Sequence, residues 1–204
     1  LVVLFWIKEN QEFFLILDEI NRQFSESIQE TQFTIVNKIY HLPPNYLSDT
    51  YPDYSYLIGN SEQKLLSIDE IETLILKELM LDARIPILAL AKKLNYSTTN
   101  INYHLKKLIK QKIIVSFIPV MDHTKLNLTH FKITLNLINP SKKNSLFQFL
   151  KQSTRVIYIT ESYGKYDLEF EFIAENINQL LNYIEEISMQ FALKQHEIIF
   201  NNKE

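Results

Sequence analysis

The segment LAKKLNYSTTNINYHLKKLIK, residues 90–110, holds two short amphipathic stretches joined by a polar turn. The first stretch has an apolar side and ends before Asn95. Ser97 is a suitable N-cap for a second helix, because its side-chain oxygen can accept a hydrogen bond from a backbone N–H of the first turn. The second stretch carries apolar residues at helical spacing: Ile101, Leu105 and Leu108. The segment therefore predicts two helices at a tight turn, the second running to about Lys110.

The sequence on either side extends this pattern. Residues 67–82 predict a preceding helix, with Ser67 as N-cap and Glu70 completing a capping box. Its apolar face recurs at helical spacing: Ile68, Ile71, Leu74, Ile75 and Leu79. Pro86 can stand in the first turn of the next helix, and residues 113–118 are β-branched and aromatic, which favours a strand. Three helices followed by a strand predict a winged helix-turn-helix domain over residues 67–120.

The charges of the chain are unevenly distributed. There are 21 Lys and Arg against 24 Asp and Glu, a formal net charge of −3. No acidic residue occurs from Ala83 to Met121, whereas the same stretch holds seven basic ones: Arg84, Lys92, Lys93, Lys106, Lys107, Lys110 and Lys112. A basic module in an acidic protein is typical of a nucleic-acid contact. Taken alone, such a run is more often a solvated face, so the helix-turn-helix order is what favours DNA.

In residues 131–200, the spacing of apolar residues changes from that of helices alone to a mixture of strand and helix patterns. Apolar and polar residues alternate in residues 131–137 and 168–172, and residues 156–162 and 196–200 also predict strands. Helices are expected after Pro140-Ser141 and over the apolar positions from Leu180 to Phe191. Gly164 is one of only two glycines, which indicates a turn that requires a positive φ. The order βαββαβ predicts a ferredoxin-like unit over residues 121–204, so the fold class is α+β.

The first forty residues repeat part of this unit. Residues 18–24 align with residues 185–191, and the preceding apolar positions align as well. We therefore expect residues 1–40 to be the back half of a second βαββαβ unit, with strands over residues 2–6 and 34–40, although any strand–helix–strand segment would look similar. Residues 41–66 contain Pro43, Pro44 and Pro52, which indicates a linker. The first residue is Leu, so we expect a fragment of a duplicated form.

The ordered motifs resemble the Lrp/AsnC family, the feast/famine regulators. Residues 68–85 resemble that family's first helix and turn, residues 90–94 its second helix, and residues 97–108 its recognition helix; residues 113–114 lead into the strand that links the domains. Gly164-Lys165-Tyr166-Asp167 resembles the Gly-x-x-Asp turn of its effector domain. The resemblance implies dimerisation through the βαββαβ sheet and an amino-acid effector near that turn. The chain departs from the family pattern at three positions: Pro86 replaces a common Ser, Lys112 a usual Gly, and His104 a frequent Arg.

Two sets of site residues follow. The expected DNA contacts are Thr98, Thr99 and Asn102 to base edges, Tyr103 to a sugar or thymine methyl, lysines to phosphates, and Ser97 and His104 beside them. The lysines of this set are Lys92, Lys93, Lys106, Lys107 and Lys110. The expected effector site is Tyr163, Gly164, Tyr166 and Asp167, because backbone N–H groups at a glycine turn can hold a carboxylate. The alternative is that Gly164 only turns the hairpin and Asp167 caps it.

Enzyme chemistry finds little support in the sequence. Two glycines cannot build a dinucleotide or phosphate loop, and the five histidines show no metal-ligand spacing, so we expect neither a cofactor nor a metal. One enzyme alternative is a tetrapyrrole decarboxylase, a class that resembles this two-domain fold and would use His123 or His130. A sensor or scaffold without DNA binding is another alternative.

The expected setting and partners follow from composition and fold. The chain has no Cys, and its opening apolar run is too short to span a bilayer. We expect a cytoplasmic regulator that binds double-stranded DNA and no membrane. It should form a homodimer, an intramolecular pseudo-dimer or a higher even oligomer.

Overall fold

The computed structural model describes residues 3, 5, 7, 10–47, 55–60 and 66–200. The chain divides into two units, Leu1–Thr34 and Ile35–Glu204. In the first unit, the amphipathic stretch predicted to be helical forms α1, Asn10–Phe24, and Phe13 packs edge-on against Phe33. The strand expected over residues 2–6 lies largely outside the described residues.

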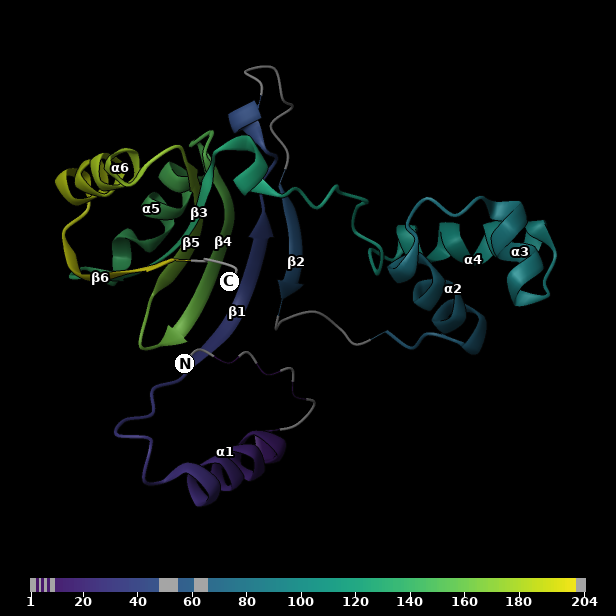
Figure 1. Cartoon of the computed structure of the whole chain (residues 1–204), viewed down its shortest axis with the longest axis horizontal. Helices are drawn as coiled ribbons and strands as arrows, with labels where there is room; N and C mark the ends of the chain where they lie inside the picture. Colours follow the sequence, from purple (N-terminus) through teal and green to yellow (C-terminus); the bar gives the residue numbers. More distant parts are fainter. Residues whose placement is uncertain are drawn as a thin grey trace. The chain divides into compact units, whose positions relative to one another are not determined.

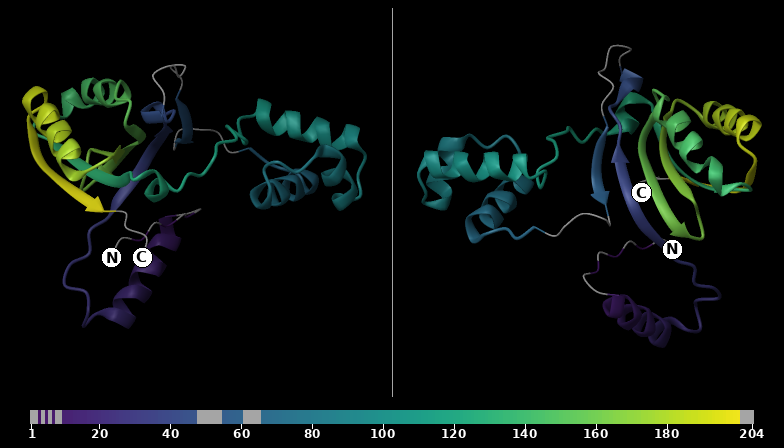
Figure 2. Two further views of the ribbon diagram at one scale, coloured as in Figure 1. Left: turned by 45° about the horizontal axis from the view of Figure 1, so that its top comes forward. Right: turned by 180° about the vertical axis from the view of Figure 1, so that it is seen from behind.

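In the second unit, the described residues form one six-stranded sheet of order β2-β1-β4-β5-β3-β6. Its βαββαβ part consists of β3 (Thr129–Leu137), α5 (Lys143–Lys151), β4 (Val156–Gly164), β5 (Leu168–Ala174), α6 (Ile177–Gln190) and β6 (Leu193–Phe200). β3 is antiparallel to both β5 and β6. Helices α5 and α6 cover the same face of the sheet (Figures 1 and 2). The ferredoxin-like unit predicted from the alternation is therefore confirmed.

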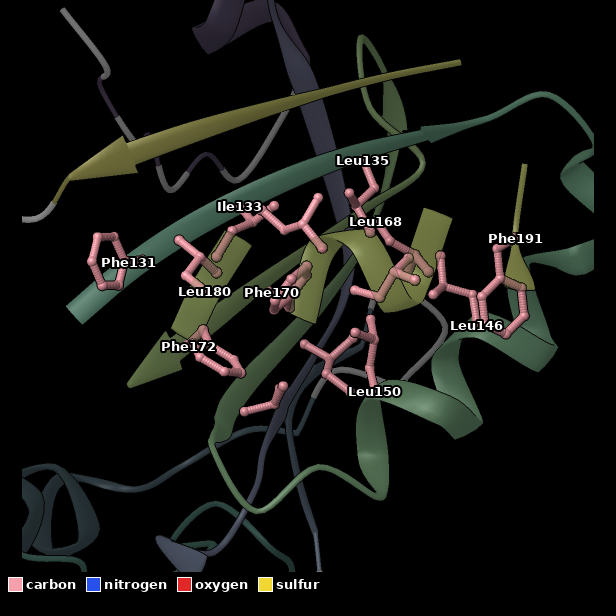
Figure 3. Packing of buried hydrophobic residues seen from close by; sticks show 14 of the residues in the cluster. Phe131, Ile133, Leu135, Leu146, Leu150, Leu168, Phe170, Phe172, Leu180 and Phe191 are labelled. Carbon is pink, nitrogen blue, oxygen red and sulfur yellow. The ribbon is translucent and has the colours of Figure 1, made fainter. Parts of the chain in front are cut away.

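The core of this unit lies between the sheet and its two helices. Alternation along β3 and β5 places every second side chain on the helix-covered face, and these side chains meet those of α5 and α6 (Figure 3). Members without exposed surface include Ile133, Leu135, Leu146, Leu150, Leu168 and Leu180. Burying a side chain of this kind contributes roughly 1.5–3 kcal/mol, so this core fixes the sheet on which the loops and turns are mounted.

The hairpin of β1 (Thr34–His41) and β2 (Tyr56–Asn60) extends the sheet beside β4. The backbone N–H of Leu42 donates to Ile157 O at 2.8 Å, and Leu42 is 2% exposed within the main core. The segment expected to be the last strand of a half unit, and expected to pair with the second unit, lies beside β4 of that unit, and the expected linker contains a strand. Within the βαββαβ unit alone, β4 would be an edge strand, and an edge strand offers unpaired backbone groups to an extended segment nearby. This long-range pairing cannot be inferred from the prolines of residues 41–66.

The helix-turn-helix is built from α2 (Glu70–Leu81), α3 (Ile87–Leu94) and α4 (Thr98–Lys110). These three helices bury a separate small core of Ile75, Leu90, Ala91, Ile101 and Leu108. Ser97 is the N-cap of α4 as predicted, since its hydroxyl accepts from Asn100 N at 3.2 Å. Asn95 makes the turn between α3 and α4 in the left-handed conformation, with φ 59°.

Two local expectations in this domain were wrong. The N-cap of α2 is Asp69, not Ser67, and the capping box pairs Asp69 with Glu72. The helix begins two residues later than its apolar periodicity suggested, because Ile68 fits the apolar pattern without being helical. The strand expected over residues 113–118 is not formed: residues 111–114 are turn and bend, and residues 115–118 carry no regular element. β-branched residues form a strand only where a second strand is available for pairing.

α4 ends in a Schellman motif. Lys112 N donates to Ile109 O and Ile113 N to Leu108 O, both at 3.0 Å. This geometry requires a left-handed residue, and Lys112 has φ 57°. A glycine would adopt this conformation without the clash of a Cβ atom, which explains in physical terms why glycine suits this position.

We therefore expect Lys112→Gly to raise the free energy of unfolding by about 1 kcal/mol, because it relieves the cost of a left-handed side-chain residue. Gln111→Gly is the matched control, since Gln111 has φ −79° and should lose stability by roughly 0.5–1 kcal/mol. Urea unfolding of both variants makes the comparison. An unchanged or lower stability of Lys112→Gly would contradict the assigned conformation.

Among the described residues, no helix combines the length and apolarity needed to cross a membrane.

Candidate nucleic-acid interface

One face of α4 gathers most of the residues expected to contact bases. Thr98 and Thr99 are exposed in its first turn, Asn102 is half-buried and Tyr103 is 65% exposed. A shallow hollow is lined by Thr99, Asn102, Tyr103 and Lys106, and a second one by Tyr103, Lys106, Lys107 and Lys110. The two hollows share Tyr103 and Lys106, so polar groups near the N-terminus of α4 continue into cationic ones along the same face.

His104 and Lys107, which also lie on α4, have their contacts with α2. Lys107 Nζ lies 2.7 Å from Glu72 Oε1 and 3.8 Å from Asp69 Oδ2. His104 Nδ1 lies 3.5 Å from Asp69 Oδ2 and 3.6 Å from Glu72 Oε1, and its side chain is only 12% exposed. Both residues were among the expected DNA contacts, and in the structure both lie against the two carboxylates at the start of α2.

Glu72 has no exposed surface, which makes its charge the focus of this contact. Burial acts to raise the pKa of Glu72, but hydrogen bonds from Lys107 and from the Asp69 backbone outweigh burial and leave that pKa below its ordinary value. The hydrogen bond to Glu72 in turn raises the pKa of Lys107. Both groups are therefore ionised at neutral pH, and the charge of Lys107 is used within the domain.

The other basic residues of the stretch without Asp or Glu, residues 83–121, differ in their surroundings. Lys93 Nζ lies 2.5 Å from Glu78 Oε2 of α2. Lys93 is nevertheless exposed, as are Arg84, Lys92, Lys106, Lys110 and Lys112. Acidic residues of α2 precede the acid-free stretch in sequence but reach it in space, which the linear charge count could not show.

The turn after β4 has the geometry that Gly164 predicted, with φ 121°. The Asp167 carboxylate accepts from Leu137 N at 2.9 Å, so it braces the end of β3. The Tyr166 hydroxyl bonds to Glu197 on β6. Tyr163 is 62% exposed, with the Lys143 ammonium 5.1 Å from its ring centroid. Of the four expected effector residues, Asp167 and Tyr166 are thus engaged in holding the turn. No sequence motif pointed to Lys143, which lies beside the turn.

His123 and His130 lie next to each other, with ring centroids 6.0 Å apart. His123 Nε2 is 2.6 Å from the Tyr46 hydroxyl, and His130 Nε2 is 2.8 Å from Glu171 Oε2. Tyr46 follows β1, so this contact ties the hairpin segment to the sheet. His41, at the end of β1, packs edge-on against Tyr158 of β4. These histidines therefore have partners within the fold.

Acidification should weaken the contacts that His41 and His123 make between the β1 segment and the rest of the unit. Burial lowers the pKa of His41, and burial together with the nearby His130 lowers the pKa of His123, from the ordinary value of 6.5. The unfolded chain then binds more protons than the folded one as the pH falls through 6.5, so the stabilisation is present above this pH and is lost below it.

We expect the free energy of unfolding, measured by urea titration, to fall between pH 7.5 and 5.5, and His123→Gln to reduce that fall. His196→Gln is the control, because His196 is exposed on β6 and should leave the pH dependence unchanged. Equal pH dependence of His123→Gln and the unsubstituted chain would contradict the assignment.

The sequence of the helix-turn-helix and the fold of the chain are both similar to those of known proteins. Residues 68–115 match the family model described as winged helix-turn-helix DNA-binding. The transcriptional regulator AzlB of Bacillus subtilis is 27% identical over 128 residues, which cover 61% of this chain and 82% of AzlB. Escherichia coli AsnC superposes with a TM-score of 0.58 at 22% identity, covering 68% of this chain and 95% of AsnC. A Neisseria meningitidis regulator solved as a complex with L-Met, NMB0573, gives 0.61 at 15% identity, covering 68% and 92%.

The helix-turn-helix and its family match put residues 68–115 in the class of winged helix-turn-helix DNA-binding domains, and the similar protein AzlB is a transcriptional regulator. Within that class, the chain has the fold and domain order of the Lrp/AsnC regulators, as its sequence motifs predicted.

Proposed function

We propose that this chain regulates transcription by inserting α4 into the major groove of specific DNA sites. The observation that carries this proposal is the single exposed face of α4 formed by Thr99, Asn102, Tyr103 and Lys106. The inward side of the same helix is fixed by Ile101 and Leu108 in the domain core. A helix held in this way presents a rigid surface, which is what direct readout of base edges requires.

The proposed contacts divide by chemistry. Thr98, Thr99 and Asn102 contact base edges from the first two turns, with Tyr103 against a sugar or a thymine methyl. Lys106 and Lys110 further along α4, and Lys92 at the end of α3, contact phosphates. Lys93 and Lys107 contribute less in this proposal, because each has a carboxylate partner on α2. Ser97 acts mainly as the helix cap.

Salt dependence separates the two kinds of contact. We expect Lys106→Ala to weaken binding to all duplexes alike and to flatten the plot of log affinity against log salt by about 0.9, because one phosphate contact is lost. Asn102→Ala should instead reduce discrimination between a selected and a scrambled duplex and leave the slope nearly unchanged. Fluorescence anisotropy over a salt series measures both quantities.

Lys194→Ala is the control, since Lys194 is an exposed lysine on β6 of the other domain. It should leave affinity, slope and discrimination unchanged. If Lys106→Ala keeps its affinity for DNA and Asn102→Ala keeps its discrimination between duplexes, the proposed DNA-binding face is contradicted.

We further propose that a small molecule with a carboxylate, such as an amino acid, binds at the turn around Gly164. The related Neisseria regulator was solved with L-Met. In this chain, Lys143 at the start of α5 donates to Ser162 O at 3.2 Å and lies over the Tyr163 ring, so it places a positive charge beside the glycine turn. A glycine turn with a cation beside it is suited to a carboxylate.

Calorimetric titration with the twenty amino acids should find at least one that binds, and Lys143→Ala should weaken it at least tenfold. Lys142→Ala removes the neighbouring exposed lysine and should have no effect. If no amino acid binds, or if both variants behave alike, the turn serves only to connect β4 and β5.

The proposal also covers the location of the protein in the cell and its assembly. A regulator of this type works where DNA is found, which we take to be the cytoplasm. The face of the sheet opposite α5 and α6 is the surface that we propose for pairing of two such sheets, either between chains as a homodimer or within one longer chain as a pseudo-dimer.

A further inference from the structure

Three side chains that can bind a metal ion converge beneath the recognition helix. Asp69 and Glu72 come from the start of α2, and His104 comes from the middle of α4. One ligand atom from each lies within 4.8 Å of the other two. His104 is more than 30 residues from the two acidic residues in the sequence, so neither spacing nor the histidine pattern pointed to this group.

The capping box of α2 holds both carboxylates in place. Asp69 Oδ1 accepts from Glu72 N at 2.8 Å, and Glu72 Oε2 accepts from Asp69 N at 3.0 Å. Each carboxylate thus has one oxygen committed to the helix end. The second oxygens, Asp69 Oδ2 and Glu72 Oε1, both face His104 Nδ1. The cap therefore preorganises the donors on the α2 side.

The separations fit a tetrahedral ion. Zinc binds nitrogen and oxygen ligands at about 2.1 Å, so two ligands of a tetrahedral site lie roughly 3.4 Å apart. His104 Nδ1 is 3.5 and 3.6 Å from the two oxygens. The two carboxylate oxygens lie within 4.8 Å of each other, so the side chains must draw together for all three donors to reach one ion, with water as a fourth ligand.

The site already holds a positive charge in the form of Lys107. Its ammonium lies 2.7 Å from Glu72 Oε1 and 3.8 Å from Asp69 Oδ2. Glu72 is fully buried and its Oε1 faces the Lys107 ammonium. Within the described part of the chain, His104 Nδ1 is a buried atom without a hydrogen-bond partner. An imidazole nitrogen facing two carboxylate oxygens needs either a proton or a shared cation, and an ion bound to all three would satisfy them together.

We propose that Asp69, Glu72 and His104 bind a divalent transition-metal ion such as zinc, and that Lys107 occupies this position in the metal-free protein. A donor set of one imidazole and two carboxylates favours zinc over magnesium, which prefers six oxygen ligands. Metal binding displaces the Lys107 ammonium from Glu72. Lys107 lines the same hollow as Lys106 and Lys110, so the displaced side chain becomes free for a phosphate.

The metal site is tested without DNA. Isothermal titration of the chelator-treated full chain with ZnCl₂ should show a site that His104→Gln removes. His123→Gln, in the other histidine cluster, should retain that site. Lys107→Met keeps most of the aliphatic stem but removes the competing charge, so it should bind zinc at least tenfold more tightly and regain thermal stability when zinc is added.

A second variant guards against a folding defect in His104→Gln. Asp69→Asn retains a side-chain oxygen for the cap but loses the charged ligand, and it should also bind zinc more weakly. Retention of the full zinc signal in both His104→Gln and Asp69→Asn would overturn the site, as would unchanged or weaker binding in Lys107→Met.

The effect on DNA is a separate step, which rests on the proposed function. With zinc bound, the salt slope of DNA binding should steepen by about 0.9, because Lys107 adds one phosphate contact. The slope of Lys107→Met should not respond to zinc. Zinc binding with an unchanged slope would refute the release of Lys107 while leaving the metal site intact, and failure to bind DNA at all would be visible in the zinc-free control.

Discussion

The buried carboxylate of Glu72 is the constraint on which the recognition helix depends. A charge without exposed surface is stable only when cations and hydrogen-bond donors surround it. Here the donors are the Asp69 backbone at the start of α2 and the Lys107 ammonium on α4. The interaction therefore joins the end of one helix to the middle of another and sets which side of α4 faces inward. The opposite side, with Asn102 and Lys106, is the side that we propose for DNA.

The same constraint changes how the charges of the domain should be understood. In the sequence, residues 83–121 contain basic residues and no acidic ones, as expected for a surface that binds phosphates. In the folded domain, Glu72 and Glu78 of α2 pair with Lys107 and Lys93. The basic surface is consequently narrower than the sequence implied and is centred on Lys106, Lys110 and Lys92. A linear charge count overestimates a binding surface whenever a neighbouring helix supplies counter-charges.

Local patterns predicted the parts of the fold that local interactions determine. Ser97 caps α4 because a hydroxyl at that position meets the first-turn N–H groups, and Gly164 has a positive φ because the turn requires one. Long-range partners decided the remainder. Residues 113–118 are not a strand despite their β-branched composition, whereas Tyr56–Asn60 became one beside β1 within a proline-rich segment. His104 and Lys107 could not be distinguished from groove-facing residues by spacing, because only the position of α2 reveals their carboxylate partners.

Hydrogen–deuterium exchange of the full chain, with and without a selected duplex, tests the role of α4 most directly. Backbone amides of residues 97–110 should exchange more slowly when DNA is added, since the helix is then held in the groove. Amides of β3 and β5, within the sheet, should be unaffected. Protection confined to the sheet, or no protection anywhere at low salt, would contradict the proposal that α4 is the DNA-reading element of this protein.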